Sequence, residues 1–314
     1  MKKAIGIATS DWHFWHVAPV WRSNEKNWLE AMGRQLHQVV DAAIENQCPI
    51  FMGGDVFDHY NPVPETVNFL MSHLPEDVEV YAVPGQHDLE HHVMTEESMK
   101  KTGFEILRET SLIAPLFDIQ FLSPTTRSKC MVYFAPWGTD FSTIHVKDNP
   151  DTINILLAHR YVWFDENTKY GGTDVPEGKL TGNFKTWLQK FDFAIFGDNH
   201  IPFRKKIGRC QVINPGTLVK RKIDERDYKT GYTVMFDDGS IEFHEFDTSE
   251  DKYLEIQVTE PSNLNVSSRE FMDRLRAMEG EEIDYRTEIE NKLRDMNRPD
   301  MEKQFTEIFD KYGA

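Results

Sequence analysis

The sequence predicts an α/β protein in which several strands bring polar side chains to one edge of a sheet. Short apolar runs alternate with segments of helical spacing along most of the chain. Several of these runs end near a turn, and an aspartate, a histidine or an amide follows. Open α/β sheets bind ligands at the carboxyl ends of their strands, so we expect the functional site there.

Length and charge limit the kinds of function. With 314 residues, the chain can hold one large domain with a small appendage, or two modest domains. A hydrophobic content of 39% is enough for a packed core. The net charge of −17 is unlike that of a protein that binds nucleic acid unaided, which usually has a basic surface. Either the substrate is small, or metals and a partner offset the repulsion; an acidic balance also fits simple solubility.

The cysteines and the apolar runs indicate the compartment. Cys48, Cys130 and Cys210 are far apart and form no CxxC pair, which favours a reducing environment over disulfides or a thiolate zinc site. The apolar run at the N-terminus is too short for a signal peptide, and no later run reaches membrane length. We therefore expect a cytoplasmic protein.

The first predicted strand, Ala4–Ala8, is followed by Asp11 and His13. Alternate residues of an extended segment share a face, so these two side chains should point the same way. A capping aspartate with an incidental surface histidine would give the same pattern. The aromatic-rich residues 14–21 are interpreted as a lid or stacking surface beside the site, or as packing beneath the loop.

A helix with apolar residues at helical spacing over Asn24–Gln47 leads into a buried strand, Ile50–Met52. Two glycines end this strand, and Asp55 follows them. An aspartate after such a turn is often a turn former or a cap. Here it belongs to a series of similar strand ends, and we place it at the carboxyl end of the sheet.

The third strand end is the richest in polar groups. A second helix opens at Pro62 and Pro64, and the strand Val78–Val83 follows it. That strand ends at a glycine turn with Gln86, His87 and Asp88 directly after it. An amide, an imidazole and a carboxylate therefore occur together.

The second half of the chain repeats the pattern. The strand over 152–158 is apolar enough to be buried on both faces, and His159 follows it. The strand over 193–196 is followed by Asp198, Asn199 and His200. The remaining expected elements are an antiparallel pair over 117–122 and 131–134, a helix over 184–191, and a hairpin of 232–236 with 241–246.

The composition changes near Asp247, which predicts two domains, 1–247 and 248–314. A strand-like segment, Tyr253–Val258, begins the second, and charge-laced helical segments follow over 267–278, 283–296 and 301–312. Such helices usually present solvated faces. Phe271, Leu275 and Met278 nevertheless form an apolar stripe suited to docking on a partner.

A common sheet edge would gather these strand ends into one cluster. Mixed carboxylate, imidazole and amide ligands suit divalent metal ions, and a shared carboxylate suits a pair of ions. The candidate residues are Asp11, His13, Asp55, Gln86, His87, Asp88, His159, Asp198, Asn199 and His200.

These residues stand in the order of a known set of motifs. From residue 5 to about 218 the chain resembles the calcineurin-like metallophosphoesterases, whose blocks run D-x-H, G-D-x-x-D, G-N-H-D/E, H and G-H-x-H. The resemblance implies a two-sheet β sandwich flanked by helices in four layers, αββα, with a small C-terminal cap. Asn214-Pro215-Gly216-Thr217 and the blocks at Gln86 and Asp198 look most like the DNA repair exonucleases, which include the nuclease subunit of SbcCD-type complexes and phage-encoded relatives. His59 stands where the protein-phosphatase branch has arginine.

The resemblance also implies roles by position. The first metal would be bound by Asp11, His13, Asp55 and His200, and the second by Asp55, Gln86, His159 and Asp198, so that Asp55 bridges them. His87 aligns with the family's catalytic histidine, and Asp88 would orient its ring. Gln86 replaces the usual asparagine, Asp198 replaces a histidine, and Asp58 stands where the repair nucleases often have histidine. With an oxygen ligand in place of nitrogen, we expect Mn²⁺ or Mg²⁺ rather than zinc.

The resemblance predicts a DNA exonuclease or endonuclease subunit of repair, recombination or replication, acting in a bacterial cell or a phage-infected host. The sequence has no Walker A loop, so ATP dependence would come from a coiled-coil ATPase subunit docked on residues 266–314. It does not decide between a monomer and a homodimer. One alternative is a phosphodiesterase for nucleotides or other small esters; another is a non-catalytic scaffold on the same fold.

Overall fold

The computed structural model describes residues 2–115, 120–122, 129–146, 151–169, 178–180 and 182–255. The chain divides into two units, Met1–Leu254 and Glu255–Ala314, and the helices and strands given below lie in the first. The helical segments predicted beyond residue 266 lie outside the described residues, and the predicted domain boundary after residue 247 stays a prediction.

The described elements alternate between strands and helices in the first half of the unit. The helices are α1 (Trp28–Asn46), α2 (Pro64–His73), α3 (Glu96–Met99), α4 (Gly103–Glu109) and α5 (Gly182–Leu188), with short 3-10 turns at Val20–Arg22, Glu90–His92, Phe141–Thr143, Glu166–Thr168 and Ile223–Glu225. The strands are β1 (Ala4–Thr9), β2 (Ile50–Met52), β3 (Val80–Ala82), β4 (Ala114–Pro115), β5 (Gln120–Leu122), β6 (Lys129–Ala135), β7 (Thr152–His159), β8 (Phe193–Gly197), β9 (Phe203–Ile207), β10 (Cys210–Asn214), β11 (Gly231–Phe236) and β12 (Ile241–Glu245).

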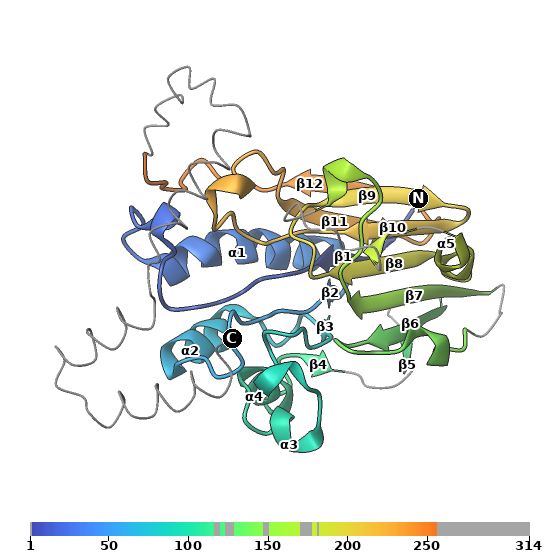
Figure 1. Ribbon diagram of the computed structural model, residues 1–314, viewed down its shortest axis with the longest axis horizontal. Helices are drawn as coiled ribbons and strands as arrows, with labels where there is room; N and C mark the ends of the chain where they lie inside the picture. The colour runs from blue at the N-terminus through green and yellow to red at the C-terminus, as the bar shows by residue number, and fades with distance from the viewer. Residues whose placement is uncertain are drawn as a thin grey trace, which may run out of the picture. The chain divides into compact units, whose positions relative to one another are not determined.

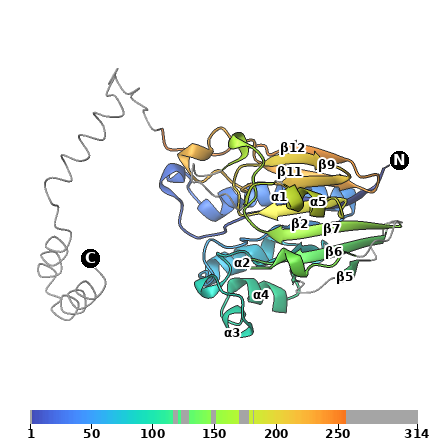
Figure 2. The same ribbon diagram turned by 45° about the vertical axis from the view of Figure 1, so that its right-hand side comes forward.

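Within the described residues these strands form two mixed six-stranded sheets (Figure 1). The first sheet has the order β12-β11-β1-β2-β3-β4, with β1 to β4 parallel and β11 antiparallel to β1. The second has the order β5-β6-β7-β8-β10-β9, with β6, β7, β8 and β10 parallel. Figure 2 shows β5, β6 and β7 side by side. The predicted antiparallel pairing of β5 with β6 and the hairpin of β11 with β12 are confirmed.

Three hydrophobic clusters divide the unit into four layers. One cluster lies between the sheets and contains Phe51 of the first sheet together with Leu157 and Ile195 of the second. Leu156 and Phe196, their neighbours in the chain, face the opposite way and pack with Leu188 of α5. This alternation follows from the period of two in a strand. The αββα sandwich predicted from the sequence is confirmed, and β7 is buried on both faces as expected.

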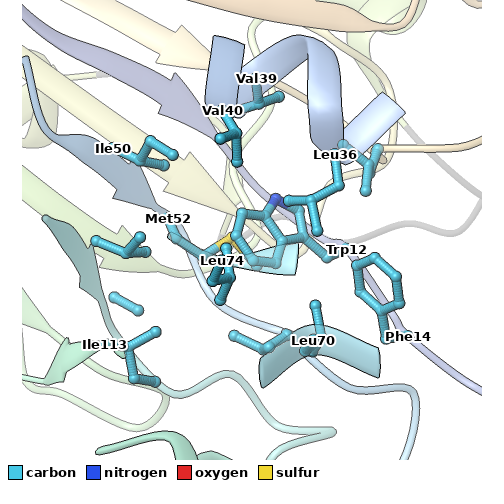
Figure 3. Close-up of a cluster of buried hydrophobic side chains, with 14 of the residues drawn as sticks. Trp12, Phe14, Leu36, Val39, Val40, Ile50, Met52, Leu70, Leu74 and Ile113 are labelled. Carbon is cyan, nitrogen blue, oxygen red and sulfur yellow. The ribbon is translucent and has the colours of Figure 1, made fainter. Parts of the chain in front are cut away.

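The remaining cluster lies between the first sheet and the helices α1, α2 and α4, which Figure 1 shows apart from α5. Figure 3 shows Trp12 and Phe14 inside it, near Leu36 of α1 and Leu70 of α2. Both aromatic side chains are fully buried, and the Trp12 indole N–H donates to Thr9 Oγ1 at 3.0 Å. Phe14 therefore packs in the core and does not form part of a lid. These anchors hold the loop that carries Asp11 and His13.

Local signals set the bounds of the main helices. The side chain of Asn27 caps α1 by accepting the backbone N–H of Glu30, and Gln47 ends the helix in a left-handed conformation. Pro64 begins α2, as its fixed φ favours. One prediction was wrong: Tyr253 to Glu255 form no strand, and the rest of that predicted segment lies outside the described residues.

Candidate metal centre

The five predicted strand ends meet at one edge of the sandwich. β1, β2 and β3 are parallel, as are β7 and β8, so the carboxyl ends of each group share an edge. Two hydrogen bonds join the two edges: the His159 ring Nδ1 lies 2.7 Å from the Gly53 carbonyl oxygen, and the Asp198 backbone N–H donates to Asp11 Oδ1 at 3.0 Å. Loops distant in the sequence therefore converge.

The backbone is strained where these loops meet. Asp11, His13, Asp55 and Asp198 have positive φ angles of 49°, 50°, 56° and 78°. Such conformations cost of order 1–3 kcal/mol each for residues other than glycine and cluster at functional sites. The burial of Trp12 and Phe14 contributes about 1.5–3 kcal/mol each, which is enough to offset the strain in their loop. Within this loop, Trp12 and Phe14 lie in the core, while Asp11 and His13 lie at the site.

One group of ligand atoms contains Asp11, His13 and His200, whose candidate ligand atoms lie within 4.8 Å of one another. The Nε2 atoms of His13 and His200 are 3.1 Å apart, and Asp11 Oδ1 lies 3.9 Å from His13 Nε2. All three residues are buried. Burial, together with the Arg221 cation, lowers the pKa of His13 to about 3, which keeps its ring neutral as a metal ligand must be.

A second group surrounds His159. Its Nε2 lies 2.7 Å from Gln86 Oε1, and Gln86 Nε2 donates to Asp198 Oδ1 at 2.9 Å. Burial would lower the pKa of His159, but the carboxylates of Asp55, Asp11 and Asp198 raise it to about 10. A metal cation bound between the same carboxylates would take the place of the imidazolium proton of His159, because a histidine must be neutral to bind a metal.

Asp55 lies between the two groups. Its Oδ2 atom is 3.7 Å from His13 Nε2 and 3.5 Å from His159 Nε2, while its Oδ1 atom accepts the backbone N–H of His87 at 2.9 Å. Burial would raise the pKa of Asp55, but His159 and His13 hold it below its usual range. The position of this carboxylate is the one that a bridging ligand requires.

The donor set fits a pair of divalent cations. Among the described residues, Asp11 Oδ2 and Asp55 Oδ2 are buried without a hydrogen-bond partner. A buried carboxylate oxygen without a partner is costly, and a cation would satisfy both. Burial, with a smaller contribution from Asp55, raises the pKa of Asp11 to about 6, although His159 and His200 act to lower it.

Two carboxylates lie beside the Nδ1 atoms of the His13 and His200 rings, on the side away from the candidate metal position. Neither was predicted from the sequence to hold a metal ligand in place. Asp58 Oδ1 lies 3.1 Å from His13 Nδ1, and His200 Nδ1 lies 3.1 Å from Glu225 Oε1. The hydrogen bond to Glu225 fixes the His200 ring so that Nε2 faces the candidate metal position, whereas the contact of Asp58 with His13 lacks hydrogen-bond geometry. Arg221 joins the pair: its guanidinium binds Asp58, and its backbone N–H donates to Glu225 Oε2 at 2.6 Å. Glu225 is fully buried, although the charged stretch around it is typical of a solvated surface.

Of the two candidate catalytic residues, only Asp88 differs from its predicted role. His87 is half-buried, its ring centre lies 5.0 Å from that of His13, and its Nδ1 lies 2.9 Å from the Asp58 carbonyl oxygen. Asp88 does not take that Nδ1, which corrects the expected orienting role. Its carboxylate instead accepts the backbone N–H groups of Val56, Phe57 and Gly85, at 3.2, 3.0 and 3.0 Å.

Asp88 is therefore a structural group that fastens the loop after β2 to the loop after β3. Burial and the nearby Asp55 raise its pKa to about 7, against the lowering effect of the three N–H donors.

At two positions in these loops, any side chain would clash with a neighbouring residue, so glycine is required there. A Cβ at Gly54, where φ is 102°, would lie 2.2 Å from His159 Nδ1, and one at Gly85 would lie 2.1 Å from Asp55 Oδ1.

A cavity of about 350 Å³ opens beside the second group of ligands. His159 and Asp198 form part of its wall. The other lining residues are Trp137, Gly138, Thr139, Phe141, Arg160, Tyr161 and Gly178. This cavity was not predicted, because no sequence motif marks the loop after β6 that contributes Trp137.

A family model matches this arrangement of motifs. Residues 7–202 match the model of the calcineurin-like phosphoesterases. The chain belongs to this family. The family and the clustered donors support a phosphoester hydrolase that uses divalent metal ions. Among the described residues, no helix has the length and apolar character needed to cross a membrane.

Several solved structures are similar to this chain. TT1561 of Thermus thermophilus is 14% identical with a TM-score of 0.46, covering 78% of this chain and 100% of that chain. The 5′-nucleotidase of Candida albicans is 13% identical with a TM-score of 0.48, covering 79% of this chain and 53% of that chain. The phosphopantetheinyl hydrolase of Mycobacterium tuberculosis is 13% identical with a TM-score of 0.42, covering 72% of this chain and 93% of that chain. The comparison with curated proteins found no match.

Proposed function

We propose that this calcineurin-like phosphoesterase is a metal-dependent nuclease that hydrolyses phosphodiester bonds of DNA. The observation that carries the hydrolytic part is the position of Asp55 between two groups of metal-ligand type. The DNA part is supported by the blocks at Gln86, Asp198 and Asn214, which resemble the DNA repair exonucleases. The complete set of donors argues against a non-catalytic scaffold.

The side chains have separate tasks in this proposal. Asp11, His13 and His200 would hold one cation, Gln86, His159 and Asp198 the other, and Asp55 both. When bound, two divalent cations supply Lewis acidity at the phosphate and a lower pKa for the attacking water. Glu225 keeps the His200 ring in the orientation that binding needs, and Asp58 lies beside the His13 ring.

His87 is the candidate for proton transfer to the leaving oxygen. The ring is held by the Asp58 carbonyl at Nδ1, which assigns the proton exchange to Nε2. As an imidazolium it would donate the Nε2 proton to the leaving oxygen, and as a neutral ring it would take a proton back. The hydrogen bond from its backbone N–H to Asp55 ties its position to the bridging carboxylate.

The net charge of −17 opposes binding of DNA by this chain without help. Two divalent cations would reduce the repulsion at the site itself. We include in the proposal a coiled-coil ATPase subunit that holds the DNA and docks on residues 266–314, with the complex acting in the cytoplasm.

Incubation of the purified protein with Mn²⁺ and end-labelled linear DNA, duplex and single-stranded, tests the proposal. We expect shortening of the strand that stops on chelation of the metal and is lost in His87→Gln. Asp247→Asn, at an exposed position, is the matched control and should retain wild-type rates. Intact DNA in every reaction, including those to which the proposed ATPase subunit is added, with a small diester cleaved normally, would reject DNA as the substrate.

A phosphodiesterase for small nucleotides is the second candidate. The cavity of about 350 Å³ beside His159 and Asp198 favours it, because the volume suits a single small ligand. The two candidates differ in the ratio of kcat/KM for an oligonucleotide to that for a dinucleotide. A ratio well above one favours the nuclease, and a ratio below one favours the small-molecule enzyme.

A further inference from the structure

The cavity beside the second group of ligands combines features of a binding site for a flat, aromatic ligand. Three of its lining residues, Trp137, Phe141 and Tyr161, carry aromatic rings, and Arg160 adds a cation. Trp137 and Tyr161 are half-buried, whereas Phe141 is 8% exposed. The two half-buried rings therefore offer surface to a ligand, and Phe141 supports the wall.

The wall of this cavity is fixed to the metal-ligand loops. The backbone N–H of Trp137 donates to the Pro84 carbonyl at 3.1 Å, two residues before Gln86, and the Trp137 ring centre lies 6.2 Å from that of His159. Tyr161 follows His159 by two residues at the end of β7. A ligand in the cavity would thus lie next to a phosphate bound at His159 and Asp198.

Arg160 is held in the wall by the neighbouring rings. Its guanidinium carbon lies 4.9 Å from the ring centre of Phe141 and 5.9 Å from that of Phe184, in the geometry of cation–π contacts. This places a hydrogen-bond donor group among aromatic surfaces. A ligand with a π-face and acceptor atoms at its edge matches both features.

We propose that this cavity binds the nucleobase of the nucleotide whose phosphate lies at the second group of ligands. Nucleobases have the required shape, since each presents a π-face for stacking and edge atoms that accept hydrogen bonds. Stacking of this kind tolerates all four bases, so the cavity would select for a nucleotide rather than for a sequence. The inference rests on the proposed function and specifies where the substrate's base lies.

Calorimetric titration of the Mn²⁺-loaded, full-length protein with two phosphomonoesters tests the proposal. Thymidine 5′-monophosphate carries a base, and 2-deoxyribose 5-phosphate does not. We expect the wild type to bind the thymidylate between about fivefold and a hundredfold more tightly, the range of one stacked base. Trp137→Ala and Tyr161→Ala should each remove most of that difference while leaving the affinity for deoxyribose 5-phosphate unchanged.

Trp137 also packs against the hydrophobic core, so Trp137→Phe serves as a milder variant that keeps a ring for stacking and should keep most of the preference. Phe243→Ala, on the distant strand β12, is the matched control for loss of an aromatic ring. Equal binding of the two ligands by the wild type, or an equal loss of both in Trp137→Ala and Tyr161→Ala, would overturn the base site. Absence of DNA cleavage with the base preference intact would overturn the nuclease and leave the base site standing.

Discussion

His13 and His200 face each other through their Nε2 atoms at 3.1 Å, although 187 residues separate them in the chain. Each ring has a carboxylate behind it, Asp58 for His13 and Glu225 for His200. Arg221 links the two carboxylates, since its guanidinium binds Asp58 and its backbone N–H donates to Glu225. Asp58, Glu225 and Arg221 thus form a connected network behind the first group of ligands.

Glu225→Gln should weaken metal binding at the first group by about 10- to 100-fold, the usual cost of losing a support behind a ligand. The amide keeps the size of the side chain but removes the charge that faces His200 Nδ1. Calorimetric titration with Mn²⁺ measures the effect directly. Asp224→Asn, at the exposed position next to it, is the control, and an affinity in Glu225→Gln equal to that of the control would contradict the role.

The sequence could bring the candidate ligands together because each lies at the end of a strand or within a few residues of it, and parallel strands share their carboxyl edge. The carboxylates beside the His13 and His200 rings, Asp58 and Glu225, could not be assigned in this way. Glu225 lies in a 3-10 turn within a charged stretch, and only the tertiary packing buries it. The role expected for Asp88 was wrong for a related reason: three backbone N–H donors compete for its carboxylate, and a motif records no backbone partners.

The strands were predicted more reliably than the short helices. β7 and β8 have apolar residues on both faces, which leaves few alternatives. The sequence analysis did not anticipate α3 and α4, each at most seven residues long, since a few turns give too little periodicity. The cavity beside Trp137 was also not foreseen, because it is formed by loops from separate strands.

Asp55→Asn should reduce the number of bound metal ions per chain and lower kcat by about a thousandfold or more, the effect of losing a charge that acts at both cations. The amide retains the oxygen that accepts from His87 but carries no charge between His13 and His159. Metal analysis of the dialysed protein measures the number of ions per chain, and turnover of bis-p-nitrophenyl phosphate measures kcat. Two ions per chain with unchanged turnover would remove Asp55 from the bridging position.

Oxygen donors at the second group, from Gln86 and Asp198, should make Mn²⁺ or Mg²⁺ support more activity than zinc. Asp198→His restores a nitrogen donor and should shift the ratio of zinc-supported to manganese-supported turnover toward zinc. The ratio is measured with the metal-free protein reconstituted separately with each ion. Highest turnover with zinc in the wild type would contradict the assignment.

Deletion of residues 266–314 should abolish binding to the proposed coiled-coil ATPase subunit and leave hydrolysis of a small phosphodiester within about twofold of the full chain. The prediction follows from the apolar stripe of Phe271, Leu275 and Met278 in the sequence. Co-purification with the ATPase and turnover of bis-p-nitrophenyl phosphate separate the two effects. Retention of the ATPase by the shortened chain would place the docking surface elsewhere.

The acid stability of the unit should depend on Glu25, which joins α1 to the residues that end the described chain. Its Oε1 accepts from Arg22 at 2.7 Å, from Arg34 at 2.9 Å and from the backbone N–H of Lys252 at 2.7 Å, while Asp251 lies 3.1 Å from Arg22. Burial would raise the pKa of Glu25, but these donors hold it below its ordinary value of 4.5. A lowered pKa in the folded state contributes stability above pH 4.5, and the contribution is lost as the pH falls through the folded value.

Glu25→Gln should therefore lower Tm by several degrees at pH 7, and the difference from the wild type should shrink below about pH 4. Loss of charged hydrogen bonds of this kind costs about 1.5–3 kcal/mol, which corresponds to a shift of roughly 3–12 °C for a unit of this size. Thermal unfolding of the metal-free protein at both pH values provides the measurement. Glu30→Gln, at an exposed position of α1, should change Tm little at either pH, and a Glu25→Gln deficit that persists undiminished at low pH would show that the carboxylate charge is not its source.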